Sequence, residues 1–288
     1  MQALTRNSLA GNLLPPRHVS RRSRAVRPRS IRAPALFDED GETLTAVLTE
    51  GTETLPPLVE VSVKVGQKDV RVVKPPGVDE LWQWYEMTGN MEADPSWGRL
   101  WETSKQLSRC IFDEVDFLDV RGKRVAEVGC GLGLVGLSAA MNDCASVIFC
   151  DREPLAIHCA LSSAAVNNLQ VVGVQDLQSK KPAPGTCSGS LLDWADPQAL
   201  GQPVDVVLGA DCLYDPSTAA LLARCCRELV AGEGTVVLSE PEKERALGCR
   251  EAFLTAAATS GASRTEILSP PPGPQGEPPS VFIVATWT

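Results

Sequence analysis

The chain has 288 residues, of which 43% are hydrophobic, and its formal net charge is −9. This length suffices for one large α/β domain with extensions, and no apolar run approaches the roughly 20 residues of a membrane-spanning helix. Beyond residue 36 the chain carries 19 basic and 36 acidic residues. Because binding to phosphate backbones requires dense Lys and Arg, this balance excludes a non-specific nucleic-acid binder and favours basic partners. We therefore expect a soluble protein, acting as a monomer.

The first 36 residues have the opposite charge, with eight arginines and no acidic residue. Such a segment resembles an organelle transit peptide, and its Pro and Ser residues, which interrupt any amphipathic helix, favour the chloroplast over the mitochondrion. A disordered basic tail on a cytoplasmic protein is the alternative. Residues 37–56 have few periodic apolar positions, which predicts a disordered linker.

Residues 57–98 are expected to form an N-terminal extension. The stretch 58–76 alternates between Val and polar residues around a turn at Gly66, which predicts a β-hairpin. Residues 79–89 are expected to be helical. Residues 95–115 then show apolar side chains at helical spacing, which predicts one amphipathic helix that carries Trp101.

From Lys123 onward, strands and helices alternate. The expected strands are 124–130, 146–151, 189–194, 204–214, 235–241, 263–269 and 280–288, and the expected helices are 134–142, 153–168, 216–230 and 243–259. A Pro/Gly-rich insertion lies around 179–189. This alternation predicts an α/β fold, namely a Rossmann-like doubly wound sheet of seven strands. The sheet is mostly parallel, and its C-terminal strand is antiparallel because no helix separates the last two strands. Residues 99–288 would form this domain.

The ten cysteines include no CxxC pair. Cys130, Cys150 and Cys212 lie within apolar patterns, where a thiol packs as a small hydrophobic group. We therefore expect neither a metal site nor a disulfide framework, and a reducing compartment.

The glycines of residues 125–140 can be read in two frames. Gly129, Gly131 and Gly133 form GxGxG, which is typical of a loop that holds S-adenosylmethionine. Gly131, Gly133 and Gly136 form GxGxxG, which is typical of a dinucleotide loop. Both frames place a ligand at the carboxyl end of a parallel strand.

Two acidic residues are expected to lie next to this loop, and one of them, Glu127, favours the first frame. Asp151 ends the second expected strand, 20 residues after Gly131, where it suits the ribose hydroxyls of either cofactor. Glu127 precedes the loop and would repel the anionic pyrophosphate of a dinucleotide. It would attract S-adenosylmethionine, whose ammonium and sulfonium groups are cationic.

With these acids in place, "VAEVGCGLGLVGL…VIFCD" resembles the first two motifs of class I S-adenosylmethionine-dependent methyltransferases. Three further segments resemble the methyltransferase-like protein-lysine family; they are "GRLWETSKQLSRCI" before the sheet, "LLDW" at the third strand and "DCLYDP" after the fourth strand. The similarity covers roughly residues 57–288, and the insertion at 170–189 departs from it.

The resemblance implies a set of site residues. In order from the methionine end of the donor to its adenine, the implied cofactor contacts are Trp101, Glu127, Gly129, Gly131, Gly133, Asp151, Asp193 and Trp194. Asp211 and Tyr214 fill the DxxY motif of the family and would border the acceptor channel. Several of these residues have an alternative role: core packing for Trp101, a solvated strand end for Glu127, and covering of the sheet edge for Trp194. Asp211 and Tyr214 could instead cap the next helix.

We therefore predict a methyltransferase that modifies a lysine on a protein substrate. A lysine ammonium has no lone pair, so it must lose a proton before it can attack the methyl group. An apolar channel lowers its pKa, and Asp211 is expected to orient the amine and to pass its proton towards water. A small-molecule N- or O-methyltransferase, a non-catalytic S-adenosylmethionine-binding protein that docks on a partner, and an NAD-dependent oxidoreductase are the alternatives.

Overall fold

A computed structural model of the chain describes residues 56–179, 182–197, 200, 202–271, 273 and 276–288. The predicted transit peptide and all but the last residue of the predicted linker lie outside the described residues. Within the described ranges, no helix is long and apolar enough to cross a membrane.

The core of the fold is a sheet of seven strands in the order β5-β4-β3-β6-β7-β9-β8. Its strands are β3 (Arg124–Val128), β4 (Ser146–Asp151), β5 (Thr186–Leu191), β6 (Val204–Ala210), β7 (Val230–Pro241), β8 (Arg264–Leu268) and β9 (Ser280–Trp287). Strand β9 is antiparallel to both of its neighbours, and the pairings from β5 to β7 are parallel. The predicted Rossmann-like sheet is therefore confirmed.

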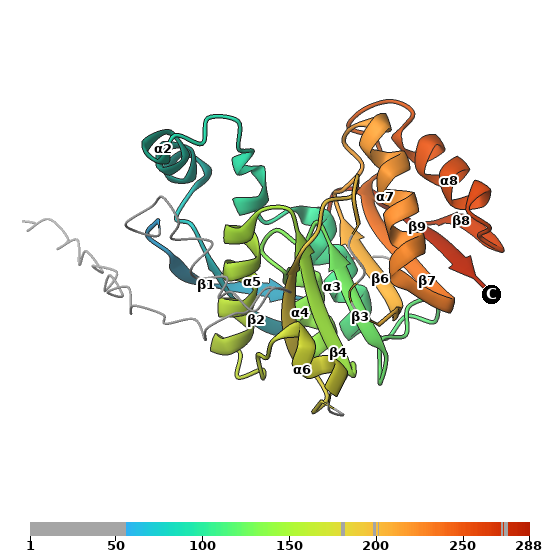
Figure 1. Cartoon of the computed structure of the whole chain (residues 1–288), viewed down its shortest axis with the longest axis horizontal. Helices are drawn as coiled ribbons and strands as arrows, with labels where there is room; N and C mark the ends of the chain where they lie inside the picture. Colours follow the sequence, from blue (N-terminus) through green and yellow to red (C-terminus); the bar gives the residue numbers. More distant parts are fainter. Residues whose placement is uncertain (1–55, 180–181, 198–199, 201, 272, 274–275) are drawn as a thin grey trace, which may run out of the picture.

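Helices cover both faces of the sheet (Figure 1). The described helices of the chain are α2 (Val78–Thr88), the 3₁₀ helix η1 (Pro95–Gly98), α3 (Glu102–Phe112), α4 (Leu134–Ala140), α5 (Pro154–Val166), α6 (Val174–Ser179), α7 (Pro216–Leu229) and α8 (Cys249–Thr259). Alternate residues of β3 point to opposite faces: Val125 packs in the cluster of α3, α4 and α5, and Ala126 packs in the cluster of α7 and α8. The fold is thus doubly wound.

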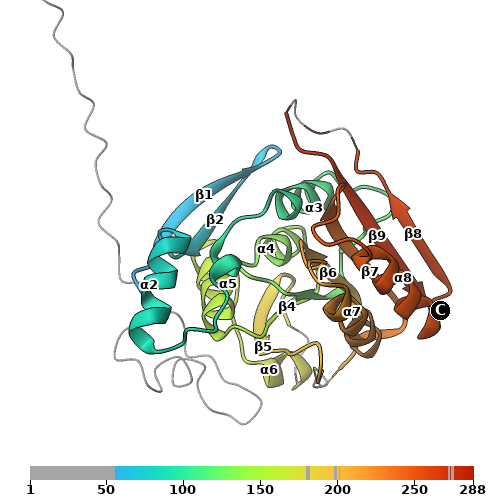
Figure 2. The same ribbon diagram turned by 90° about the horizontal axis from the view of Figure 1, so that it is seen from above.

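The predicted hairpin, β1 (Val59–Val65) and β2 (Lys68–Lys74), forms an additional layer outside α5 (Figure 2). Side chains of α5 pair with the free edge of β2. The backbone N–H of Val73 donates to Ser163 Oγ at 2.8 Å. The amide of Asn167 accepts from the N–H of Arg71 at 3.1 Å and donates to its carbonyl at 2.6 Å. These bonds satisfy an edge that would otherwise be unpaired.

The helix predicted over residues 95–115 is divided in two. Asp94 caps η1 by accepting from the N–H of Ser96 at 2.9 Å. The chain is then extended, and α3 begins only after Trp101, whose φ and ψ are −84° and 144°. A Cβ on Gly98 would lie 3.0 Å from Leu81 Cδ2, so α2 packs tightly against this break. Trp101 therefore precedes the helix instead of lying on its apolar stripe.

Several other boundaries differ from the predictions. Strand β5 begins at Thr186 and ends at Leu191, and α6 occupies part of the insertion. The start of β5 could not be read from the sequence, because its residues are small and polar and form no apolar pattern. A Cβ on Gly189 would lie 2.4 Å from Ile157 Cγ2, so small residues are required beneath α5. Strand β7 begins directly after α7, and α8 begins six residues later than predicted.

Candidate active site

A cavity of about 570 Å³ lies at the carboxyl ends of the parallel strands, where open α/β sheets bind ligands. Nine of the ten predicted site residues line it; they are Trp101, Glu127, Gly129, Gly131, Asp151, Asp193, Trp194, Asp211 and Tyr214. Residues that follow β3, β4, β5 and β6 thus converge on one space, as the resemblance implied.

Gly133 is the predicted site residue that lies outside the cavity lining. It precedes α4 with φ of 74°, and a Cβ there would lie 2.6 Å from the Cβ of Ala160 on α5. Its role in the structure is close helix packing and a left-handed turn. Gly131 differs, because it lines the cavity with φ of 50°, and a Cβ there would lie 3.0 Å from the carbonyl oxygen of Trp97.

Glu127 and Asp151 shape the glycine loop as well as lining the cavity. Glu127 Oε2 accepts from the N–H of Gly136 at 2.8 Å, and burial raises the pKa of Glu127 to about 8. Asp151 Oδ2 accepts from the N–H of Gly131 at 2.9 Å, and Oδ1 accepts from Glu153 at 3.0 Å. Burial also raises the pKa of Asp151. A cationic ligand would favour the ionised form of both carboxyl groups.

Asp193 and Trp194 follow β5 at the far end of the cavity. Asp193 Oδ1 accepts from the N–H of Ala195 at 2.8 Å. The rings of Trp194 and Tyr214 are 6.3 Å apart at an interplanar angle of 39°. A Cβ on Gly129 would lie 3.1 Å from Trp194 Cζ2, so the ring lies against the glycine loop. Trp194 is partly buried and also packs on the core around α7.

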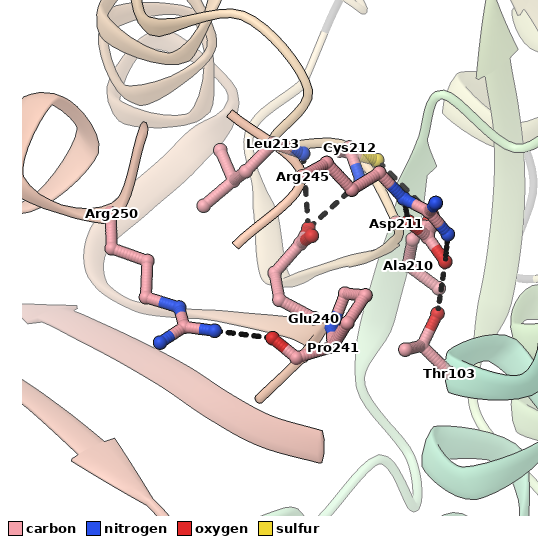
Figure 3. Close-up of polar contacts among 9 residues, drawn as sticks. All are labelled: Thr103, Ala210, Asp211, Cys212, Leu213, Glu240, Pro241, Arg245 and Arg250. Atoms are coloured by element: carbon pink, nitrogen blue, oxygen red, sulfur yellow. Dashed lines mark hydrogen bonds and ion pairs between the residues drawn. The ribbon is translucent and has the colours of Figure 1, made fainter. Parts of the chain in front are cut away.

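Asp211 follows β6 in a left-handed conformation with φ of 59°. Its side chain is only 3% exposed and pairs with the guanidinium of Arg245, whose Nη2 donates to Oδ2 at 2.8 Å (Figure 3). Thr103 Oγ1 donates to the same oxygen at 3.1 Å. Asp211 is not the cap of α7, because Asp215 caps that helix by accepting from Ser217 N–H at 2.7 Å.

Glu240, at the end of β7, holds the loop after β6. Its Oε1 accepts from the N–H groups of Cys212 and Leu213 at 2.8 and 3.1 Å (Figure 3). The residue is 2% exposed, and burial raises its pKa to about 8. Sequence reasoning missed Glu240, Arg245 and Thr103. The one available signal was a single acid directly after the apolar run of the fifth predicted strand.

The N-terminal extension also contributes to the cavity, which sequence reasoning missed. The lining includes Asp94, Trp97 and Arg99 from η1 and its flanks. Trp97 Nε1 donates to the hydroxyl of Tyr85 on α2 at 2.8 Å, and this hydroxyl interacts with the carboxylate of Glu153. The contact joins the extension to the start of α5, next to Asp151.

The ten cysteines are buried with free thiols. Burial raises the pKa of Cys130 and Cys212, which lie in or next to the loops of the cavity. Such thiols pack as small apolar groups. Among the described residues, no group of three or more His, Cys, Asp or Glu side chains is placed to hold a metal ion.

Comparison with known families agrees with this geometry. Residues 86–256, more than half of the chain, match the family model described as lysine methyltransferase. The chain belongs to this family. The matched range contains the cavity lining from Asn90 to Arg245 and ends within α8.

Three curated relatives illustrate the similarity. Protein N-lysine methyltransferase METTL21A of Danio rerio is 34% identical over 142 residues, which are 49% of this chain and 58% of that protein. The electron transfer flavoprotein beta subunit lysine methyltransferase of Xenopus laevis is 28% identical over 55% of this chain and 54% of its own length. EEF1A lysine methyltransferase 3 of Mus musculus is 32% identical over 49% and 54%. The chain thus spans little more than half the length of these relatives.

Solved structures share the fold at low identity. A candidate S-adenosylmethionine-dependent methyltransferase from Streptococcus mutans has a TM-score of 0.52 and 10% identity, over 82% of this chain and 57% of that chain. SMU.776, a candidate methyltransferase complexed with SAH, has a TM-score of 0.50 and 11% identity over the same shares. The residues of the cavity fit S-adenosylmethionine, because its lining combines buried carboxyl groups, which suit a cationic ligand, with the aromatic rings of Trp101, Trp194 and Tyr214.

The cavity is expected to bind S-adenosylhomocysteine and not NAD. Titration calorimetry should give heat with the former and no binding with the latter, whose pyrophosphate would face Glu127 and Asp151. Asp151→Asn should weaken S-adenosylhomocysteine binding by about tenfold, since a buried charge-assisted contact is lost. Asp69→Asn on the exposed hairpin is the control with unchanged affinity. Tighter binding of NAD than of S-adenosylhomocysteine would contradict the assignment of the cavity.

The stability of the protein should depend on pH through Glu240. Its pKa is about 8 in the folded protein against an ordinary 4.5, so in this window the native state holds a proton that the unfolded chain has lost. The stability from this group is therefore present below pH 4.5 and lost as pH rises to about 8, at up to about 1.4 kcal/mol per pH unit.

Glu240→Gln should remove this dependence. We expect this from urea unfolding at pH 5, 6.5 and 8. The difference in free energy of unfolding, variant minus wild type, should increase as pH rises. Glu242→Gln, at a neighbouring exposed glutamate, should follow the wild type. Parallel curves for wild type and Glu240→Gln would show that Glu240 does not titrate in this range.

Proposed function

We propose that the protein transfers a methyl group from S-adenosylmethionine to the side-chain nitrogen of a lysine on another protein. One observation carries this proposal: a single cavity is lined by the buried carboxyl groups of Glu127 and Asp151 and, at its border, by Asp211 with the exposed ring of Tyr214. Membership of the lysine methyltransferase family supports it. The substrates that appear in the names of the relatives are those of the relatives, and the proposal does not carry them over to this chain.

Each predicted residue receives a proposed role. Trp101 lies against the methionine end of the donor, Glu127 and the backbone at Gly129 and Gly131 hold its amino-acid moiety, Asp151 accepts from the ribose hydroxyls, and Asp193 and Trp194 flank adenine. Gly133 completes this loop, and its position also allows the close packing of α4 on α5. Arg245 and Glu240 are added, since they hold Asp211 and the loop that follows it.

The residues of this chain need only orient the acceptor amine and favour its neutral form. When bound, S-adenosylmethionine supplies a methyl group on a sulfonium, which is a good leaving group. Asp211 orients the incoming amine, and Trp101 and Tyr214 surround it with apolar surface. A free lysine has a pKa of about 10.4, and desolvation in such a channel favours the neutral amine that attacks. Asp211 directs the released proton towards water at the open side of the cavity.

A small-molecule N- or O-methyltransferase is the second candidate. Such an enzyme needs a cover over its substrate, and residues 90–101 of the N-terminal extension do line the cavity. Tyr214, in contrast, is 47% exposed at the mouth, which leaves room for a side chain carried by a larger partner. The acidic lining favours a cationic acceptor in either case.

The proposal predicts which molecules become labelled. Incubating the protein and S-adenosylmethionine labelled in its methyl group with a cell extract should give label in protein, recovered as methyl-lysine by mass spectrometry. Asp211→Ala should lower the rate by about 100-fold or more through loss of orientation. Asp215→Ala, which removes only the cap of α7, should keep most of the activity.

Equal S-adenosylhomocysteine affinity in all three proteins should confirm that the donor site is intact. Label found only in metabolites would favour the second candidate. Unchanged labelling with Asp211→Ala would refute the role of Asp211.

We also propose that the protein acts on its substrate as a monomer, without binding nucleic acid or membrane. The charge beyond residue 36 supports this, since 36 acidic residues stand against 19 basic ones. A basic segment around the target lysine would suit this surface.

We further propose that residues 1–36 direct the protein to the chloroplast, with the mitochondrion and the cytoplasm as alternatives. The support is the run of eight arginines without an acid. A fluorescent fusion in a photosynthetic eukaryotic cell should reach the chloroplast, and a fusion lacking residues 2–36 should not. The same distribution for both fusions would refute the targeting role.

A further inference from the structure

The guanidinium of Arg245 pairs with the carboxylate of Asp211 (Figure 3) and also lies over the ring of Trp101. It donates to both oxygens of Asp211, with Nη2 at 2.8 Å from Oδ2. Its central carbon lies 4.4 Å from the centroid of the Trp101 ring. A carboxylate and an aromatic face together make up a binding site for an organic cation.

This cation site belongs to the same cavity as the donor pocket. Trp101, Asp211 and Arg245 all line the cavity that also contains Glu127 and Asp151. Methyl transfer brings the acceptor nitrogen to roughly 3–3.5 Å from the methyl carbon, so the acceptor must enter this space. The position that the guanidinium occupies is therefore one where a substrate ammonium can be bound.

Arg245 is placed so that its side chain can leave. It is 37% exposed and lies on the segment between β7 and α8, outside both elements. Glu244 anchors this segment by accepting from the backbone N–H groups of Gly248 and Arg250 at 3.3 and 2.8 Å. Only the side chain of Arg245 has to move, and the backbone around it can stay.

Asp211 has supports that do not involve Arg245. Its N–H donates to the carbonyl of Ser239 at 2.9 Å, and Thr103 Oγ1 donates to Oδ2 at 3.1 Å. Glu240 holds the two residues that follow Asp211. The carboxylate would therefore keep its position when the guanidinium leaves, and two donors would be replaced by an incoming ammonium.

We propose that Asp211 and Trp101 form the binding site for the alkylammonium group of the acceptor, and that Arg245 fills this site as an internal stand-in until the acceptor displaces it. This inference rests on the proposed function. It assigns Arg245 a competitive role, in which its cation lowers the affinity for substrate and keeps the buried carboxylate paired between turnovers.

A second arginine supplies a matched control. Arg99 lies over the same ring, with its central carbon 5.3 Å from the Trp101 centroid. In the described part of the chain no hydrogen bond joins it to Asp211. Arg99→Ala therefore removes an equal charge from beside the same ring and leaves Asp211 paired with Arg245.

The test measures binding of n-butylammonium, a mimic of the lysine side chain, to the full chain saturated with S-adenosylhomocysteine. The indole N–H resonance of Trp101, assigned with Trp101→Phe, reports the binding by NMR. The dissociation constant in Arg245→Ala should fall by about fivefold or more relative to the wild type, because an internal competitor has been removed. Arg99→Ala and Arg245→Lys should stay within about twofold of the wild type, and n-butanol should not bind.

Two results would overturn the inference. One is an unchanged or weaker affinity in Arg245→Ala, and the other is an equal gain in Arg99→Ala, which would reflect net charge alone. Arg245→Gln replaces Arg245→Ala if the latter loses S-adenosylhomocysteine binding. The outcome is separate from the labelling experiment, since methyl-lysine can form while n-butylammonium affinity is unchanged, and the affinity can rise while no protein is labelled.

Discussion

Buried carboxyl groups at the ends of parallel strands fix the loops that form the cavity. Glu127 holds Gly136, Asp151 holds Gly131, and Glu240 holds the residues after Asp211, in each case by accepting from backbone N–H groups. An unmade bond of this kind would leave a buried donor unsatisfied, at a cost of about 1–3 kcal/mol. Two of these groups, Glu127 and Asp151, also line the cavity, so they shape the loops and face the ligand site at the same time.

Burial of these carboxyl groups changes their pKa values. Burial raises the pKa of Glu127 and of Glu240 to about 8, although the nearby guanidinium of Arg245 lowers that of Glu240, so their charged forms are unfavourable at neutral pH. A cation that enters the cavity compensates for the lost hydration and favours the charged forms. Binding of a cationic ligand is then coupled to proton release, and Arg245 already provides a compensating charge for Asp211, which is close to Glu240.

The sequence predicted the sheet because its strands and helices follow local patterns, and the family resemblance supplied nine residues of the cavity lining. Apolar strands, helix periods and acids next to strand ends are readable within a few residues. Thr103 and Arg245 were missed because they lie 108 and 34 residues from Asp211, and only the closed fold brings them together. Strand β5 begins earlier than predicted. Its residues are small and polar because α5 packs closely on them, so the strand shows no apolar pattern in the sequence. Gly133 matches its motif, and its position also allows close helix packing.

The N-terminal extension is part of the site even though it precedes the sheet. Its hairpin is tied to α5 through Ser163 and Asn167, and Trp97 reaches Glu153 through the hydroxyl of Tyr85. Because the cavity lining begins at Asn90, a division of the chain at residue 98 cuts through the cavity wall. Movement of α2 would shift η1, and with it the wall beside Gly131.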